Sequence, residues 1–168
     1  MDIVNETVCS DTAGKPIIII DDHTPYLGRN ANTPFYHNGI KYKTFAHFCE
    51  CQKALLMESY DTFHAANRAR SPARATTSAL GMTVDDEKWY RTAEEKLLEG
   101  LTSKFSQNYG ALSALKSTKG QKIIYADAKD GYLGTGLSKT NPANGDETSW
   151  PGKNKLGHLM CKVRSNLA

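Results

Sequence analysis

The spacing of hydrophobic and polar positions along this chain changes between two periods, and that spacing predicts most of its elements. Short β-branched or apolar runs at 16–20 and 122–126 are typical of buried strands. Asn38-Gly39 lies between two short alternating segments, which predicts a hairpin over 34–44. Apolar positions at helical spacing, with capping residues before them, predict helices at 44–57, 61–69, 71–81, 85–105, 109–116 and 156–167. Gly100 is expected to weaken the long fourth helix.

The order of these elements predicts the fold class. A chain of 168 residues suits one domain with a real hydrophobic core. We expect a single α+β domain over 1–168, mostly helical and packed on a small sheet and a hairpin, with an N-terminal extension at 1–25 that carries one strand. The segment 131–153 is predicted to form one long loop because it is rich in Gly, Asn, Pro, Ser and Thr. Loops of that length are typically functional or mobile.

Composition excludes several classes of protein. With 21 basic and 18 acidic side chains the net charge is +3, which is too balanced to indicate general nucleic-acid binding but allows local recognition of phosphate. No signal-peptide pattern and no membrane-spanning run is present, so we expect no membrane association. Cys9, Cys49, Cys51 and Cys161 form no CxxC pair, which favours free thiols and a cytoplasmic protein. The five His residues lack metal-ligand spacing, so neither a metal nor a cofactor is expected, and oligomeric state is left open.

The helix expected at 44–57 carries the first candidate chemistry. Ala46, Glu50, Lys53 and Met57 fall on one face of it. Lys53 has three possible roles: a solvated helix charge, a contact to phosphate, or a covalent amine.

Two Gly-containing loops carry the other candidate binding residues. Asp130-Gly131-Tyr132-Leu133-Gly134-Thr135-Gly136 follows a strand, and its glycines would let backbone N–H groups approach an anion. Near the C-terminus, Gly152-Lys153-Asn154-Lys155-Leu156-Gly157-His158 leads directly into an amphipathic helix, whose apolar stripe would mount the loop rigidly.

Taken in order, these motifs resemble one family. The hairpin, Phe45-Ala46-His47-Phe48-Cys49-Glu50-Cys51-Gln52-Lys53, Trp89, Lys104-Phe105-Ser106-Gln107-Asn108 and the two loops are similar to the NADAR (YbiA-like) N-glycosidase family over roughly residues 26–166. The resemblance implies a largely helical α+β domain whose cleft hydrolyses an N-glycosidic bond. It also implies, as ligands, ribosylated nucleobases or ADP-ribose-like nucleotides, including ADP-ribose attached to guanine in DNA.

The resemblance also implies which residues form the site. Glu50, Lys53 and the position of Ala46 would be catalytic. Trp89 would stack on a base, although an apolar helix face also suits a core residue. The ligand-binding set implied is His47, Trp89, Asp130, Tyr132, Leu133, Gly134, Gly136, Asn154 and Gly157.

Departures from the family pattern put activity in question. Ala46 stands where the family has a catalytic Glu, Leu133 where it has a second indole, and Gly28-Arg29 where it has Ser-Asn. Three explanations of Ala46 stay open: an introduced substitution, transfer of the acid to Glu50 about 5.4 Å along the helix, or a natural binder without turnover. The sequence therefore predicts an N-glycosidase, in a form impaired at Ala46, with a non-catalytic sponge or sensor of ADP-ribose-like nucleotides as the alternative.

Overall fold

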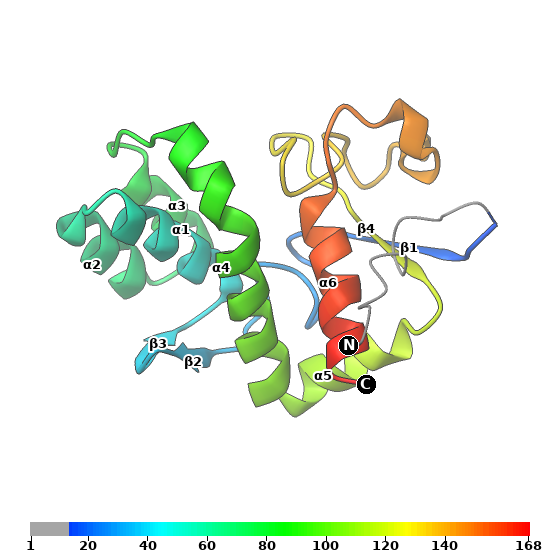
Figure 1. The fold of residues 1–168 in the computed structure, drawn as a ribbon, viewed down its shortest axis with the longest axis horizontal. Helices are drawn as coiled ribbons and strands as arrows, with labels where there is room; N and C mark the ends of the chain where they lie inside the picture. Colours follow the sequence, from blue (N-terminus) through cyan, green and yellow to red (C-terminus); the bar gives the residue numbers. More distant parts are fainter. Residues whose placement is uncertain (1–13) are drawn as a thin grey trace, which may run out of the picture.

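The computed structural model describes residues 14–168 and has a mixed α+β architecture (Figure 1). Predicted Cys9 lies outside the described residues. Along the chain the elements are β1 (Ile17–Ile20), β2 (Phe35–His37), β3 (Ile40–Tyr42), α1 (Phe45–Leu56), α2 (Tyr60–Arg68), α3 (Pro72–Ala79), α4 (Asp86–Gln107), α5 (Tyr109–Ser117), β4 (Lys122–Tyr125) and α6 (Lys155–Asn166). All six predicted helices, the two predicted strands and the hairpin are present, within a few residues of their expected bounds.

The strands form two separate pairs. β1 and β4 lie parallel, with Ile18 opposite Ile123 and Ile20 opposite Tyr125, although about a hundred residues separate them in sequence. β4 is buried along its whole length, and α6 packs against it. Because the two strands run in the same direction, the segments that follow Ile20 and Tyr125 leave the sheet at the same edge. This edge is where the cavity described below opens.

The predicted hairpin fastens the start of α1. β2 and β3 pair antiparallel around Asn38 and Gly39, both at positive φ, as an Asn-Gly turn requires. Phe35 and Tyr42 from the hairpin pack against the Phe48 ring of α1, at centroid distances of 5.6 and 5.2 Å. The Thr44 side chain accepts a hydrogen bond from the His47 N–H, so α1 begins at a fixed point relative to the hairpin.

The long helix α4 runs between the α1–α3 group and α6 (Figure 1) and contacts both α1 and α6. Asp85 caps it by accepting from the Lys88 N–H, as the acidic start predicts. The expectation that Gly100 merely weakens α4 is incomplete. A Cβ at this position would lie 2.2 Å from the Phe48 ring, so glycine is what lets α1 approach α4 closely.

One buried cation links α4 to the loop after β1. Lys104 is 1% exposed, and its ammonium donates to the backbone carbonyls of Leu27 and Gly28, at 3.4 and 3.0 Å. Burial lowers the pKa of Lys104 to about 7. The contact holds the segment that carries Arg29, a residue central to the site.

The long loop predicted at 131–153 contains two short 3₁₀ turns, Pro142–Gly145 and Glu147–Ser149. Cys49 and Cys51 are buried free thiols, in line with the sequence prediction for these two residues. Within residues 14–168, no helix combines the length and apolar character needed to cross a bilayer.

Candidate functional site

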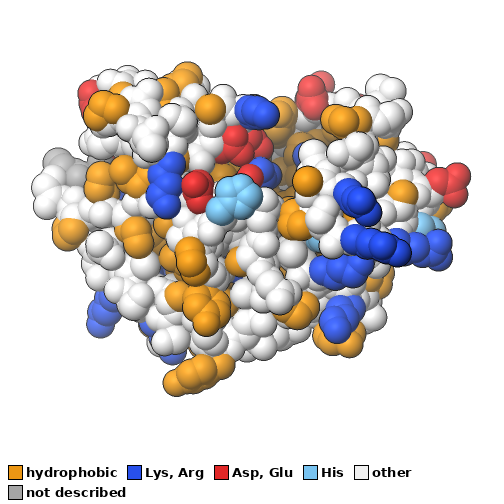
Figure 2. Space-filling view, turned by 180° about the vertical axis from the view of Figure 1, so that it is seen from behind, with side chains coloured by type: hydrophobic (Ala, Val, Ile, Leu, Met, Phe, Trp, Pro, Cys, Tyr) orange, Lys and Arg blue, Asp and Glu red, His pale blue; other side chains and the backbone are white. Residues whose placement is uncertain are grey.

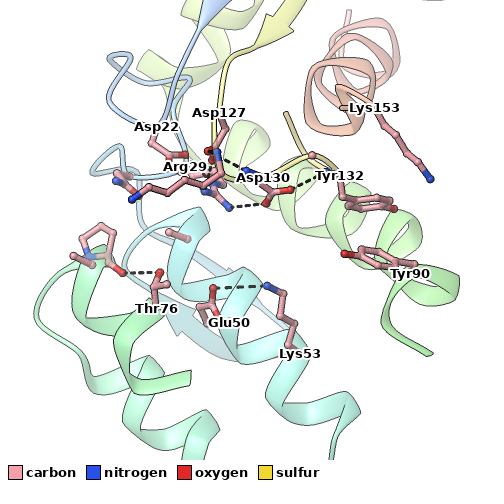
Figure 3. Close-up of a pocket in the computed structure, with 16 residues that line it drawn as sticks. Asp22, Arg29, Glu50, Lys53, Thr76, Tyr90, Asp127, Asp130, Tyr132 and Lys153 are labelled. Carbon is pink, nitrogen blue, oxygen red and sulfur yellow. Dashed lines mark hydrogen bonds and ion pairs between the residues drawn. The ribbon is translucent and has the colours of Figure 1, made fainter. Parts of the chain in front are cut away.

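A cavity of about 900 Å³ lies where α1, α3, the loop after β1 and the loop after β4 meet (Figure 3). Its wall carries four carboxylates and four basic side chains: Asp22, Glu50, Asp127, Asp130, Arg29, Lys53, Lys129 and Lys153. The remaining lining residues are Asn30, Ala46, Pro72, Ala73, Thr76, Tyr90, Gly131 and Tyr132. The space suits a nucleotide-sized ligand with both polar and aromatic parts.

Arg29 organises one side of the cavity, which we call the paired wall (Arg29 with Asp22, Asp127 and Asp130). Its guanidinium donates to the two Asp22 oxygens at 2.7 and 3.0 Å and to Asp127 at 3.3 Å, and Asp130 lies 3.8 Å away. Although burial alone would lower it, the pKa of Arg29 is raised because Asp22 hydrogen-bonds and attracts the charged form. These fixed ion pairs give the paired wall a rigid arrangement of charge.

The opposite side, which we call the α1 wall, consists of Ala46, Glu50 and Lys53. Of the four residues predicted to share a face of this helix, these three line the cavity (Figure 3), whereas Met57, the C-cap of α1, does not. Within residues 14–168, no hydrogen bond of 3.5 Å or less reaches the Glu50 carboxylate, and its ionic neighbour is Lys53 Nζ at 3.8 Å. Burial raises the pKa of Glu50, against the opposing effect of Lys53. The α1 wall therefore carries a carboxylate and an amine that remain available for a ligand.

Aromatic side chains line the cavity at α4 and at the loop after β4. The rings of Tyr90 and Tyr132 lie 4.6 Å apart between centroids, and Tyr90 is 48% exposed (Figure 3). Trp89 is only 5% exposed and lines a smaller adjoining cavity of about 120 Å³ together with Leu133. Lys53 Nζ lies 5.7 Å from the centroid of the Trp89 ring, close enough for a cation–π contact. The more accessible stacking surface is thus the tyrosine pair rather than Trp89.

The loop after β4 is held by its own hydrogen bonds. The Asp130 carboxylate accepts from the N–H groups of Tyr132 and Leu133, at 2.9 and 2.8 Å, so Asp130 both shapes the loop and faces Arg29. Gly134 packs against Asp127, and Gly136, at positive φ, packs against Pro151. Both glycines lie outside the lining of the two cavities and serve close packing of the loop.

Three other predicted ligand residues also lie outside that lining. His47 is 1% exposed and bonds Thr44 and the Ala69 carbonyl, and burial lowers its pKa. Asn154 is fully buried, accepting from the Tyr125 N–H and donating to the Ile123 carbonyl. Gly157 lets α6 approach β4, since a Cβ there would lie 2.2 Å from the Ile123 carbonyl oxygen. These buried residues fix the elements that carry the cavity walls.

Asp22, Arg29, Asp127, Tyr90 and Lys153 complete the site, although the sequence did not assign them to it. Two features of the sequence point to some of these residues. Each strand of the parallel pair is followed two residues later by an aspartate, and ligands bind beyond the carboxyl ends of parallel strands. Arg29 was visible as a departure from the family pattern, without indication of its partners. Among the described residues, no group of three or more His, Cys, Asp or Glu side chains is placed to hold a metal ion.

Comparisons with known proteins identify the family and the fold. The family model "NADAR domain" matches residues 21–168. N-glycosidase R617 of Acanthamoeba polyphaga mimivirus is 30% identical over 135 residues, covering 77% of this chain and 78% of its own. N-glycosidase YbiA of Shigella boydii is 28% identical over 136 residues, covering 80% and 76%. The solution structure of YbiA from E. coli superposes with a TM-score of 0.70 at 21% identity, over 99% of this chain and 93% of that one, which shows a shared fold.

Proposed function

Because this chain belongs to the NADAR family, we propose that it is an N-glycosidase that hydrolyses the bond between ribose and a nucleobase, on a ribosylated or ADP-ribosylated base. The observation that carries the proposal is the Glu50–Lys53 pair on the α1 wall. Both groups face a nucleotide-sized cavity, 3.8 Å apart, with the other three carboxylates of the cavity wall facing Arg29.

Cleavage of an N-glycosidic bond creates positive charge on the sugar, which a neighbouring carboxylate stabilises. Glu50 is suited to this role and, with its raised pKa, also to donating a proton to the departing base. Of the roles left open for Lys53, its position beside Glu50 favours the amine that attacks the sugar over a phosphate contact, because a carboxylate 3.8 Å away would repel phosphate.

The proposed reaction passes through a covalent bond between Lys53 and the sugar. A proton passes from the Lys53 ammonium to the Glu50 carboxylate, and the neutral amine forms a bond to the anomeric carbon. The bond from that carbon to the base nitrogen breaks, and the base leaves with its electron pair and the proton from Glu50. Water then hydrolyses the bond between the positively charged Nζ and the sugar: its hydroxyl goes to the anomeric carbon and its proton to Nζ, which releases the sugar and restores the Lys53 ammonium.

The rest of the cavity suits the other parts of such a ligand. The tyrosine pair at Tyr90 and Tyr132 offers a face on which a base can stack, and stacking tolerates different bases. Lys129 and Lys153 are exposed at the cavity and have no carboxylate within 4.0 Å among residues 14–168, so they are suited to phosphates. In the proposed complex the sugar lies against α1 and the phosphates point toward solvent.

The position of Ala46 favours a slow enzyme, and it also supports a second candidate function. Ala46 is 7% exposed and presents a methyl group to the cavity where the family has a carboxylate. Glu50 lies one turn further along α1, so its carboxylate acts from a displaced position. A non-catalytic sponge or sensor of ADP-ribose-like nucleotides would keep the cavity and need neither carboxylate.

The test measures released base by chromatography from ADP-ribosyl-guanine and ribosyl-pyrimidine substrates. We expect Glu50→Gln to lower the cleavage rate by at least ~10²-fold and Ala46→Glu to raise it by at least ~10²-fold, the usual contribution of a positioned acid–base group. Glu95→Gln, an exposed carboxylate on α4, is the matched control and should leave the rate unchanged.

Two results would favour the sponge or sensor instead. One is background cleavage by both the parent and a folded Ala46→Glu variant. The other is ADP-ribose binding, measured by calorimetry, that survives in the parent and in Glu50→Gln alike while no base is released.

A further inference from the structure

A second basic feature lies on the other side of α3. A groove of about 360 Å³ runs between α2 and α3 and is lined by Arg68, Arg70, Arg74, Thr77 and Ser78, together with two alanines. The three arginines are exposed. Figure 2 shows Lys and Arg side chains gathered on the side of the molecule where α2 and α3 lie.

The charge of this groove is not balanced locally. Residues 62–84 contain three arginines and no Asp or Glu, so this stretch alone equals the net charge of +3 of the whole chain. Within residues 14–168, no carboxylate lies within 4.0 Å of Arg68, Arg70 or Arg74, in contrast to Arg29 in the paired wall. The near-neutral composition therefore conceals one clustered cationic surface.

The turn between α2 and α3, which carries Arg70 and lies between Arg68 and Arg74, is fixed by side chains that bond its backbone. Lys43 Nζ donates to the backbone carbonyls of Arg68 and Ala69, at 3.2 and 2.9 Å, and His47 bonds the Ala69 carbonyl at 2.9 Å. The Ser71 hydroxyl caps α3 by accepting from the Arg74 N–H. Lys43 adds a fourth exposed positive charge close to the groove. Because the backbone that carries the arginines is fixed, binding of an anion orders their side chains alone.

α3 separates the groove from the cavity. Its residues Pro72, Ala73 and Thr76 line the cavity, and its residues Arg74, Thr77 and Ser78 line the groove. A helix with its side chains is roughly 10 Å wide, a distance that a short segment of single strand can span. A strand held in the groove could thus present one nucleotide across α3 to the cavity.

We propose that this groove binds the sugar-phosphate backbone of a nucleic-acid strand, and that the modified base at a terminus or unpaired position of the same strand enters the cavity. The proposal rests on the proposed function for the identity of the reacting group. Guanidinium groups bind phosphate oxygens bidentately, and spaced phosphates along one strand match spaced arginines along one groove. Because α3 carries residues of both the groove and the cavity, a strand that reaches the cavity fits this arrangement better than a lipid surface does.

Binding is tested with the full chain and a fluorescein-labelled single-stranded DNA of about 12 nucleotides, by anisotropy across a series of salt concentrations. We expect the triple variant Arg68→Ala, Arg70→Ala, Arg74→Ala to bind at least ~10-fold more weakly at low salt, with the slope of log affinity against log salt reduced by about 2. Arg91→Ala, an exposed arginine on α4, is the matched control and should bind like the parent. If the triple variant is unstable, Arg70→Gln and Arg74→Gln should each reduce the slope by about 0.7.

A cleavage assay distinguishes a failure of strand binding by the groove from a failure of the proposed N-glycosidase activity. The triple variant should retain its rate on a free ADP-ribosyl nucleoside and lose at least ~10-fold on the same group within an oligonucleotide. The proposal is overturned if the parent does not bind the oligonucleotide, if it binds heparin or anionic vesicles as tightly, or if the variant loses both substrates equally. Absence of cleavage of every substrate would count against the proposed function, while the anisotropy result would still decide whether the groove binds a strand.

Discussion

The two walls of the cavity handle charge in different ways. In the paired wall, Arg29 contacts three aspartates, two of them at hydrogen-bonding distance, so residues of the protein itself neutralise its positive charge. On the α1 wall, Glu50 and Lys53 are 3.8 Å apart and carry no closer partner among the described residues. The two walls therefore have different roles. A fully paired ion cluster fixes the shape of the cavity, whereas a loosely paired carboxylate and amine can exchange a proton with a ligand. Substitutions in the two walls should therefore affect different quantities.

The largest effect on stability is expected at the paired wall. Arg29→Met leaves Asp22, Asp127 and Asp130 close together without their cation, so the free energy of unfolding should fall by about 3 kcal/mol or more. Chemical denaturation at neutral pH measures it. Lys96→Met, which removes an exposed ion pair with Glu99 at 3.7 Å, is the control and should cost under about 1 kcal/mol. Equal losses for the two variants would show that the paired wall is not what holds the cavity in shape.

The α1 wall should respond in rate rather than in stability. Lys53→Arg keeps a positive charge but replaces the amine by a guanidinium, which does not lose its proton in proteins. We expect the cleavage rate to fall by at least ~10²-fold while ADP-ribose affinity and the melting temperature stay near those of the parent. Lys153→Arg, the same change at the cavity rim, should retain most of the rate.

A Lys53→Arg variant that cleaves nearly as fast as the parent would return Lys53 to the point-charge role that the sequence also allowed. Trapping with borohydride provides a second measurement: opening of the sugar ring converts the Lys53 adduct into an imine, which borohydride reduces to a stable secondary amine, so the peptide that contains Lys53 gains the mass of the sugar. A loss of affinity without a loss of rate would place phosphate, rather than sugar, beside this residue.

Sequence patterns were sufficient to predict the helices, the strands and the α1 wall. The α1 wall was predictable because Ala46, Glu50 and Lys53 lie on a single helix, where spacing alone fixes which residues share a face. The hairpin was equally local, because Asn38-Gly39 determines its own turn.

The paired wall was not predictable in this way. Its members come from segments about a hundred residues apart, brought together when β1 pairs with β4, and pairing between distant strands leaves no local spacing. Gly100 shows the same limit: helix propensity alone treats it as a defect, while contact with Phe48 makes it a requirement. The predicted glycine and asparagine ligands at 134, 136, 154 and 157 carry loop signals that backbone packing produces as readily as ligand binding does.

The smallest effect concerns the attachment of the paired wall, and it depends on pH. Lys104 holds the carbonyls of Leu27 and Gly28, next to Arg29, and burial lowers its pKa from an ordinary value near 10.5 to about 7. Below pH 7 both the folded and the unfolded chain carry this charge, so the cost of burying it is present in full. Between about pH 7 and 10.5 the unfolded chain holds a proton that the folded protein has released, so the contribution of Lys104 to stability rises with pH, by at most about 1.4 kcal/mol per unit.

Lys104→Met removes this group while keeping most of its apolar stem in the core. Subtracting the unfolding free energy of Lys104→Met from that of the parent at each pH, from 6.5 to 9, isolates the lysine from the other groups that titrate in this range. We expect the difference to grow with pH in favour of the parent. Parallel profiles would mean that Lys104 stays charged throughout, held by the two carbonyls, and that the loop bearing Arg29 is fastened equally at every pH.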